Sequence, residues 1–169
     1  PRVAGSTAEA GMAKLETLLP HLPDPVPSNS RGADAVQRHA IVLDLVLGPR
    51  TDWFDSESLE LLQQQCWQVT QQSNRVGLRL LGEQPLQRVS GYQGRELPSE
   101  GTALGALQVP ANGQPVLFLA DHPLTGGYPV IGCVAPHHLD LAAQLPPGVF
   151  VRFKVMAPFA EIPLVGAGA

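Results

Sequence analysis

The stretch from Arg95 to Pro129 holds most of the residues whose types and spacing suggest chemistry. Carboxylates, glutamines and glycines interrupt short apolar segments there at close intervals. Glycine weakens the interior of a strand, and proline removes a hydrogen-bond donor from it. Their abundance beside apolar segments therefore indicates a surface where the main chain comes close to a ligand or a partner.

The segment Thr125-Gly126-Gly127-Tyr128 lies between two apolar runs. Adjacent glycines can adopt positive φ values and present their N–H groups, which would form a nest for a carboxylate or carbonyl oxygen. A tight hairpin that binds nothing would use the same residues. The segment on its own leaves both interpretations open.

Two carboxylates are candidates for proton transfer. Asp121 ends an apolar run, where it can face a pocket or cap the loop that follows. Glu100 lies beside Gly101 with Glu96 nearby, and two carboxylates in one cleft can differ in pKa and so divide acid and base roles. We predict catalytic roles for Asp121 and Glu100.

Arginine and glutamine side chains supply candidates for substrate binding. Arg75 and Arg79 are four residues apart, so both would lie on one face of a strand. A guanidinium binds a substrate carboxylate through two hydrogen bonds, although salt bridges to Glu83 or Glu100 are the alternative. The amide of Gln108 matches an amide or lactam, and it would equally satisfy loose backbone groups.

Several classes of site have no support in the sequence. His137 and His138 have no cysteine or carboxylate at metal-ligand spacing, so we expect no metal site. Cys66 and Cys133 form no CxxC pair, and two free thiols of a cytoplasmic protein are the expected state. A GxSxG nucleophile motif and a GxxxxGK[ST] phosphate loop are both missing.

Composition limits the partners. The 169 residues suffice for one domain with a core, and 44% apolar against 15% charged residues favours a folded chain. The net charge is -4 and the basic residues are scattered, so we expect no nucleic-acid partner. Because no apolar run approaches the roughly 18 residues of a membrane-spanning helix, we expect no membrane partner either.

The pattern of apolar residues predicts a mainly β fold, a closed barrel with one or two short helices. Short helices are expected from about Ser56 to Gln65 and from His138 to Leu145, with a further one at 7–19. Strands are expected at 40–48, 67–71, 76–81, 104–109, 116–120, 129–134 and 149–155. We divide the chain into an N-terminal segment with a proline-rich linker (1–38), the barrel (39–157) and a tail (158–169).

Three ordered motifs carry a family resemblance over Leu45 to Phe153. They are GPRTDWF, VTQQSNRVGLRL-x-G and the pair SEG-x3-GA-x-QVP-x2-GQP with AD-x-PLTGGYP. The chain resembles the C-terminal half of the biotin-dependent carboxyltransferase-domain family. That family includes allophanate hydrolase subunit 2, the C subunit of the bacterial 5-oxoprolinase and the matching part of urea amidolyase.

The resemblance implies a cyclophilin-like β-barrel in a heteromeric enzyme that cleaves an amide or lactam with ATP. Its substrate would be a small carboxylate or amide: 5-oxoproline, opened to glutamate, or allophanate or urea. Its companion would resemble allophanate hydrolase subunit 1 or the B subunit of 5-oxoprolinase. With no recognisable nucleotide loop in this chain, an ATP site would be irregular or shared with that companion. Biotin would come only from a separate carrier, because neither Lys14 nor Lys154 follows a methionine.

We assign the site roles from the chemistry of these residues. Arg75 would bind a carboxylate, Gln108 and the amides of Gly126 and Gly127 would bind carbonyl oxygens, and Thr125 and Tyr128 would complete that segment. The main alternative is a regulatory protein that antagonises an inhibitor of a sensor kinase. A further alternative is the carboxyltransferase part of a urea carboxylase.

Overall fold

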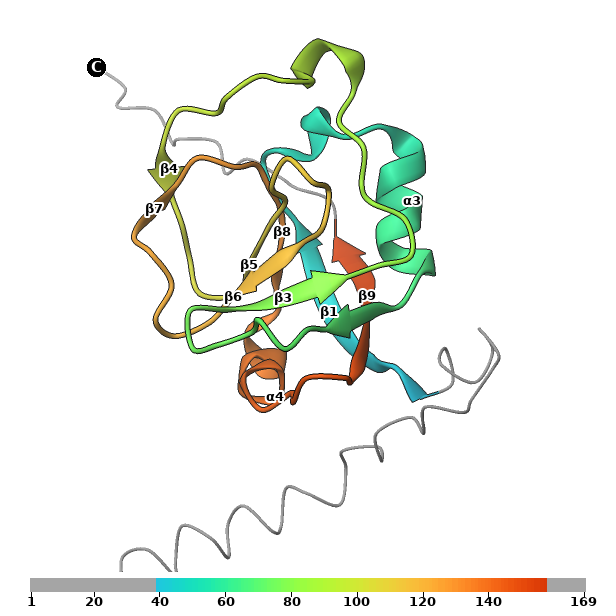
Figure 1. The fold of residues 1–169 in the computed structure, drawn as a ribbon, viewed down its shortest axis with the longest axis vertical. Coiled ribbons are helices and arrows are strands. Elements are labelled where there is room, and N and C mark those ends of the chain that lie inside the picture. Colours follow the sequence, from blue (N-terminus) through green and yellow to red (C-terminus); the bar gives the residue numbers. More distant parts are fainter. Residues whose placement is uncertain (1–38, 158–169) are drawn as a thin grey trace, which may run out of the picture.

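A closed barrel of seven strands forms the centre of the protein (Figure 1). A computed structural model describes residues 39–157. The strand order is β1-β8-β5-β6-β3-β2-β9, in which β1 pairs with β9 in parallel and the other neighbours are antiparallel. The strands are β1 (Ile41–Leu47), β2 (Trp67–Val69), β3 (Gly77–Leu81), β5 (Ala106–Gln108), β6 (Val116–Phe118), β8 (Val130–Val134) and β9 (Phe150–Ala157).

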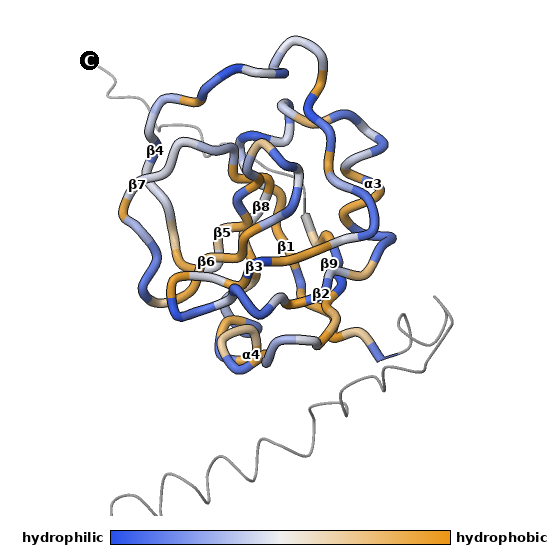
Figure 2. Tube along the Cα trace, viewed as in Figure 1, coloured by the Kyte–Doolittle hydropathy of each residue, from blue (hydrophilic) through white to orange (hydrophobic). Residues whose placement is uncertain are grey.

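The barrel interior is the hydrophobic core. In β1, Ile41, Leu43 and Leu45 are buried, whereas Val42 and Val46, on the opposite face of the strand, are exposed, as its two-residue period requires. Figure 2 shows hydrophobic residues concentrated along the barrel strands and hydrophilic ones along the connections. The largest fully buried side chains include Trp67, Phe153, Leu107 and Leu117.

Within the described residues, two short helices lie outside the barrel, α3 (Ser56–Gln64) and α4 (Leu139–Ala143) (Figure 1). The carboxylate of Asp55 caps α3 by accepting the Ser58 N–H at 2.7 Å. Leu62 of this helix is buried, and its carbonyl accepts the indole N–H of Trp67 at 3.2 Å. These contacts fix α3 against the barrel, beside β9.

A separate two-stranded sheet joins β4 (Glu100–Gly101) to β7 (Thr125–Gly126), at the left of Figure 1. Glu100 lies opposite Gly126, and Gly101 lies opposite Thr125. The long connection from β3 to β4 contains the 3-10 helix η3 (Ser90–Tyr92), and η2 (Thr51–Trp53) follows β1. This small sheet and these connections carry most of the residues considered below.

The expected fold class is confirmed, since each expected strand overlaps one of the seven barrel strands and α3 and α4 lie where helices were expected. The sequence did not predict β4 and β7. The expected helix at 7–19 and the segments 1–38 and 158–169 lie outside the described residues. Within 39–157, the helices are all too short or too polar to cross a bilayer.

Candidate functional site

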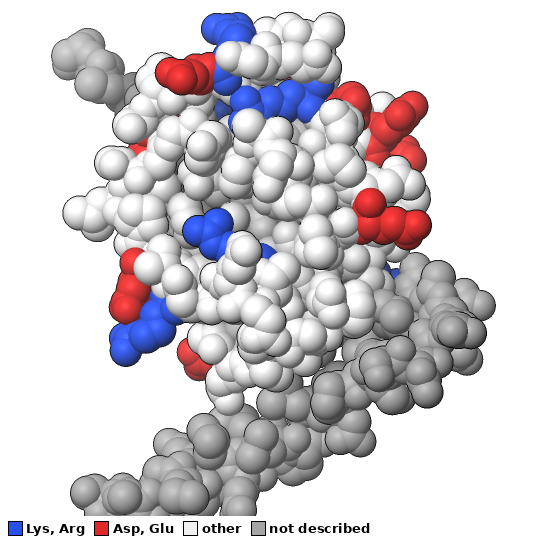
Figure 3. All heavy atoms as spheres, viewed as in Figure 1, with Lys and Arg blue, Asp and Glu red and all other residues white. Residues whose placement is uncertain are grey.

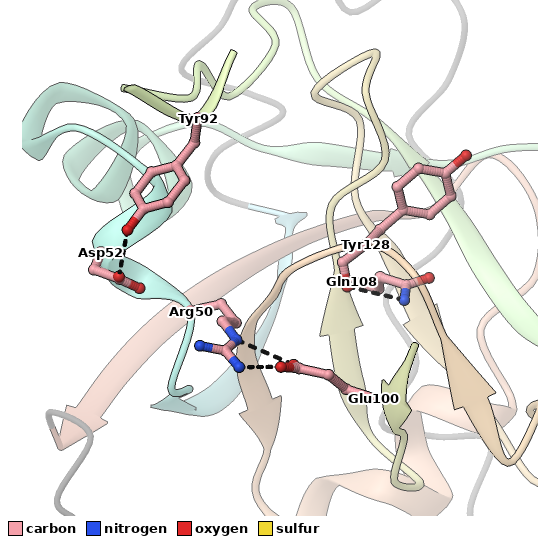
Figure 4. Close-up of polar contacts among 6 residues, drawn as sticks. All are labelled: Arg50, Asp52, Tyr92, Glu100, Gln108 and Tyr128. Carbon is pink, nitrogen blue, oxygen red and sulfur yellow. Dashed lines mark hydrogen bonds and ion pairs between the residues drawn. The ribbon is translucent and has the colours of Figure 1, made fainter. Parts of the chain in front are cut away.

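Residues of the first and the last of the three motifs meet around the β4–β7 sheet. Thr125 and Gly126 form β7, and Glu100 lies across from Gly126 in β4. Gln108 is only 6% exposed, and its Nε2 donates to the carbonyl oxygen of Tyr128 at 3.1 Å. Figure 4 shows the Gln108 amide alongside the Tyr128 main chain, with Glu100 facing Arg50. The structure therefore brings together Glu100, Gln108 and the Thr125–Tyr128 segment.

The glycines of the Thr125–Tyr128 segment do not have the backbone conformation expected of an oxygen-binding nest. Neither Gly126 nor Gly127 has a positive φ; the glycines that do include Gly94 and Gly113. A Cβ on Gly126 would lie 2.5 Å from Nε2 of Gln108, whereas one on Gly127 would meet nothing closer than the Leu97 carbonyl oxygen at 3.5 Å. The expectation of positive φ is thus wrong. Gly126 instead lets the main chain approach the Gln108 amide.

Arg50 is the partner of Glu100. The Nε of Arg50 donates to one carboxylate oxygen at 3.0 Å, and Nη2 contacts the other. Each side chain is about one third exposed. The hydrogen bond to Glu100 raises the pKa of Arg50, against the opposing effect of burial. Arg50 belongs to the GPRTDWF motif, but nothing in its spacing from Glu100 indicated this pair.

Arg75 and Asp121 lie elsewhere and pair with each other. The Nε of Arg75 is 2.9 Å from a carboxylate oxygen of Asp121, and the side chains are 84% and 49% exposed. The main chains are joined too, because the Asp121 N–H donates to the Arg75 carbonyl at 3.1 Å. These two predicted site residues therefore form a surface ion pair, separate from the Glu100 group.

A cavity of about 500 Å³ opens beside the Tyr128 segment. Gly127 and Tyr128 line one side, residues 110–112 of the β5–β6 turn line another, and residues 86–88 and 93–96 of the β3–β4 connection complete it. Figure 3 shows Lys and Arg side chains gathered on the part of the surface that this connection covers in Figure 1. Arg88 and Arg95 are the arginines in the cavity wall.

These two arginines are held on a stack of aromatic rings. Trp53 and Tyr92 are parallel, with centroids 4.5 Å apart. The Arg88 guanidinium lies 5.4 Å from the centre of the Trp53 ring, and that of Arg95 lies 5.2 Å from the Tyr92 ring. The Tyr92 hydroxyl donates to Asp52 at 3.3 Å (Figure 4). Sequence reasoning missed this stack, because Trp53 is far from the other members along the chain.

Asp44, His137 and His138 form a polar cluster on the far side of β1 from the barrel interior. Nε2 of His137 is 3.0 Å from a carboxylate oxygen of Asp44, and the potential ligand atoms of the three residues lie within 4.8 Å of one another. The sequence spacing gave no sign of Asp44, which the fold brings beside both histidines. The Asp44 N–H donates to Nδ1 of His138 at 2.9 Å, which occupies the lone pair that a metal would need.

Comparison with known proteins agrees with these motifs. The family model of the carboxyltransferase domain, subdomain A and B, matches residues 7–155. The C subunit of the Escherichia coli (strain K12) 5-oxoprolinase is 34% identical over 163 residues, 90% of this chain and 51% of that protein. The urea amidolyase of Saccharomyces cerevisiae is 33% identical over 107 residues, 60% of this chain and 6% of that protein.

A solved structure of the Kluyveromyces lactis urea carboxylase is similar as well, with a TM-score of 0.62 and 27% identity over 68% of this chain and 11% of that one. The chain spans about half the length of the Escherichia coli relative. The match extends beyond the motif span of Leu45 to Phe153, and the motifs themselves supply Arg50, Trp53 and Tyr128 to the site. The chain belongs to the family of the carboxyltransferase domain, subdomain A and B.

Proposed function

We propose that this chain is part of the C subunit of a 5-oxoprolinase, which opens the lactam of 5-oxoproline to glutamate together with a companion protein. The observation that carries the proposal is the 34% identity to the Escherichia coli 5-oxoprolinase C subunit over 90% of this chain. The motif residues Gly127 and Tyr128 line a cavity with two arginines, which suits a small anionic substrate.

Lactam opening needs an activated carbonyl. Transfer of the γ-phosphoryl group of ATP to the lactam oxygen releases ADP and makes the ring carbon electrophilic. One water then adds to that carbon as the C–N bond breaks, which leaves γ-glutamyl phosphate, and a second water hydrolyses this to glutamate and phosphate. The described residues offer ATP no evident place. The helix α3 is the one long enough to bind phosphate at its N terminus, and the Asp55 carboxylate occupies that end. We therefore assign ATP binding to the companion protein or to an interface with it.

Glu100 is the better placed of the two carboxylates proposed for proton transfer. Glu100 is ion-paired with Arg50 and does not itself line the cavity, but strand pairing joins it to Gly126, next to the cavity residue Gly127. Asp121 is ion-paired on the surface with Arg75 and does not line that cavity. Gln108 supports the site by holding the Tyr128 carbonyl, so we assign it to positioning.

The carboxyltransferase part of a urea carboxylase is the second candidate. It is favoured by the TM-score of 0.62 to the Kluyveromyces lactis urea carboxylase and by the urea amidolyase of Saccharomyces cerevisiae. In that case the substrate would be urea, and a separate carrier would supply biotin.

One assay separates the two functions. The chain is co-purified with its companion protein and incubated with ATP and 5-oxoproline, and glutamate is quantified by mass spectrometry. The proposal expects glutamate release that needs ATP and both proteins. ATP-dependent carboxylation of urea with a biotinylated carrier, in the absence of glutamate release, would establish the second candidate instead.

A further inference from the structure

Arg88 has unsatisfied hydrogen-bonding capacity in the cavity wall. Its Nε–H is shielded from solvent and has no acceptor among residues 39–157. Nη1 donates to the Arg95 carbonyl at 3.1 Å, and Nη2 reaches the Val109 carbonyl only at 3.5 Å. Because Nε is out of reach of a ligand, the donors left for an acceptor in the cavity are the weakly bound Nη2 and the second hydrogens of the two Nη atoms.

The charge of Arg88 is also uncompensated. Arg50 pairs with Glu100, and Arg75 pairs with Asp121. Arg88 and Arg95 have no such carboxylate partner in the described part of the chain. Glu96 is the acidic residue that lines the same cavity, so the wall carries one net positive charge. That charge suits a monoanion better than a dianion.

The shape of the group favours a planar anion. The Arg88 guanidinium is packed over the indole of Trp53, which is only 5% exposed and stacks on Tyr92. The indole and the hydrogen bonds to the Arg95 and Val109 carbonyls together restrict the movement of the guanidinium. A planar guanidinium in a fixed orientation matches the two oxygens of a carboxylate.

We propose that Arg88 is the residue that binds the carboxylate of the substrate, in the place that sequence reasoning gave to Arg75. This inference rests on the proposed function, because it takes 5-oxoproline as the substrate. The main chain at Gly127 and Tyr128 then faces the remainder of a small ligand, since both residues line the same cavity.

Two probes and two variants test the inference by calorimetry on the assembled protein. The probes are 5-oxoproline and pyrrolidin-2-one, the same lactam without the carboxylate. Arg88→Met should weaken 5-oxoproline binding by about 10- to 100-fold, the scale of losing a charge-assisted hydrogen bond. It should leave pyrrolidin-2-one binding unchanged. The control Arg152→Met removes an arginine of β9 that does not line the cavity, and it should change neither.

Steady-state kinetics on the same preparations separates this inference from the proposed function. If Arg88→Met turns over 5-oxoproline at the wild-type rate and with an unaltered KM, the role of Arg88 is overturned and the proposed function stands. If 5-oxoproline binds in a manner that depends on Arg88 but is never turned over, the role of Arg88 stands and the proposed function is refuted. Should Arg88→Met fail to fold, equal wild-type affinity for 5-oxoproline and pyrrolidin-2-one would refute the inference. Displacement of 5-oxoproline by a lower concentration of inorganic phosphate would assign Arg88 to a phosphoryl group and overturn it too.

Discussion

Replacing Gly126 by alanine is the sharpest test of how the site is built. The added Cβ would lie 2.5 Å from Nε2 of Gln108 and 3.2 Å from Cγ2 of Thr102. An ordinary contact between such atoms is about 3.5 Å, so the Gln108 amide must retreat by roughly 1 Å. That movement takes Nε2 away from the Tyr128 carbonyl, now 3.1 Å distant, and out of hydrogen-bond range.

The cost follows from burial. Gln108 is 6% exposed, so its amide finds little water to replace the lost bond. Leaving such a donor unsatisfied costs about 1–3 kcal/mol, and we expect Gly126→Ala to lower the free energy of unfolding by that amount. Gly127→Ala is the matched control. Its Cβ meets only the Leu97 carbonyl at 3.5 Å and its φ is not positive, so a change within about 0.5 kcal/mol is expected.

Urea unfolding of the two variants and wild type measures both numbers, and a double mutant identifies the cause. With Gln108→Ala in the background, Gly126→Ala has no amide to displace and should cost little, giving a coupling energy of about 1 kcal/mol or more. Equal stabilities for Gly126→Ala and Gly127→Ala, or no coupling to Gln108, would refute the close-approach argument.

Three more outcomes are expected. Glu100→Gln should slow 5-oxoproline turnover by about 100-fold, as loss of a general acid or base does. Asp121→Asn should change turnover by less than about threefold. Similar effects of the two variants in steady-state assays would contradict the assignment of proton transfer to Glu100 rather than Asp121. Trp53→Leu should lower the free energy of unfolding in urea by about 3 kcal/mol, because a buried indole is lost. It should also raise the KM for 5-oxoproline, because the Arg88 guanidinium loses the ring that it lies over. An unchanged KM would contradict this. Burial raises the pKa of the Cys66 and Cys133 thiols, so iodoacetamide should alkylate them at least about tenfold more slowly at pH 8 than in the unfolded chain. Because the folded state favours the neutral thiol, stability should fall as the pH rises above about 8.5, and a Cys66→Ser, Cys133→Ser double variant should show a smaller fall.

The barrel could be predicted from the sequence because local patterns encode it. The alternation of buried and exposed residues in Ile41–Leu47 and the cap at Asp55 are readable within a few residues. The β4–β7 sheet was missed for the opposite reason. Each of its strands has only two residues, one of them glycine, so neither is long enough to show an alternation of apolar and polar residues. Both strands exist only because they pair with each other.

The site was predicted in part. Glu100, Gln108 and the Thr125–Tyr128 segment were predicted and do meet, since they lie in connected motifs. Arg75 was assigned a ligand from its strand position alone. In the fold, the main chain of Asp121 is hydrogen-bonded to the main chain of Arg75, and this contact places the Asp121 carboxylate where it pairs with the Arg75 guanidinium. Arg88 gave no signal, because its role depends on an indole 35 positions earlier, brought to it by the fold.

The arrangement of glycine and arginine changes how the site would select its ligand. Had Gly126 and Gly127 formed a nest, backbone N–H groups would have bound any oxygen anion, with little regard to its total charge. Instead, Gly126 is taken up by contact with Gln108, and the charge in the cavity comes from side chains, two arginines set against Glu96. Selection by such a wall depends on net charge. On this argument a monoanionic lactam is favoured over both its neutral analogue and a dianion, and removing the charge of Glu96 is the change that would relax the discrimination against dianions.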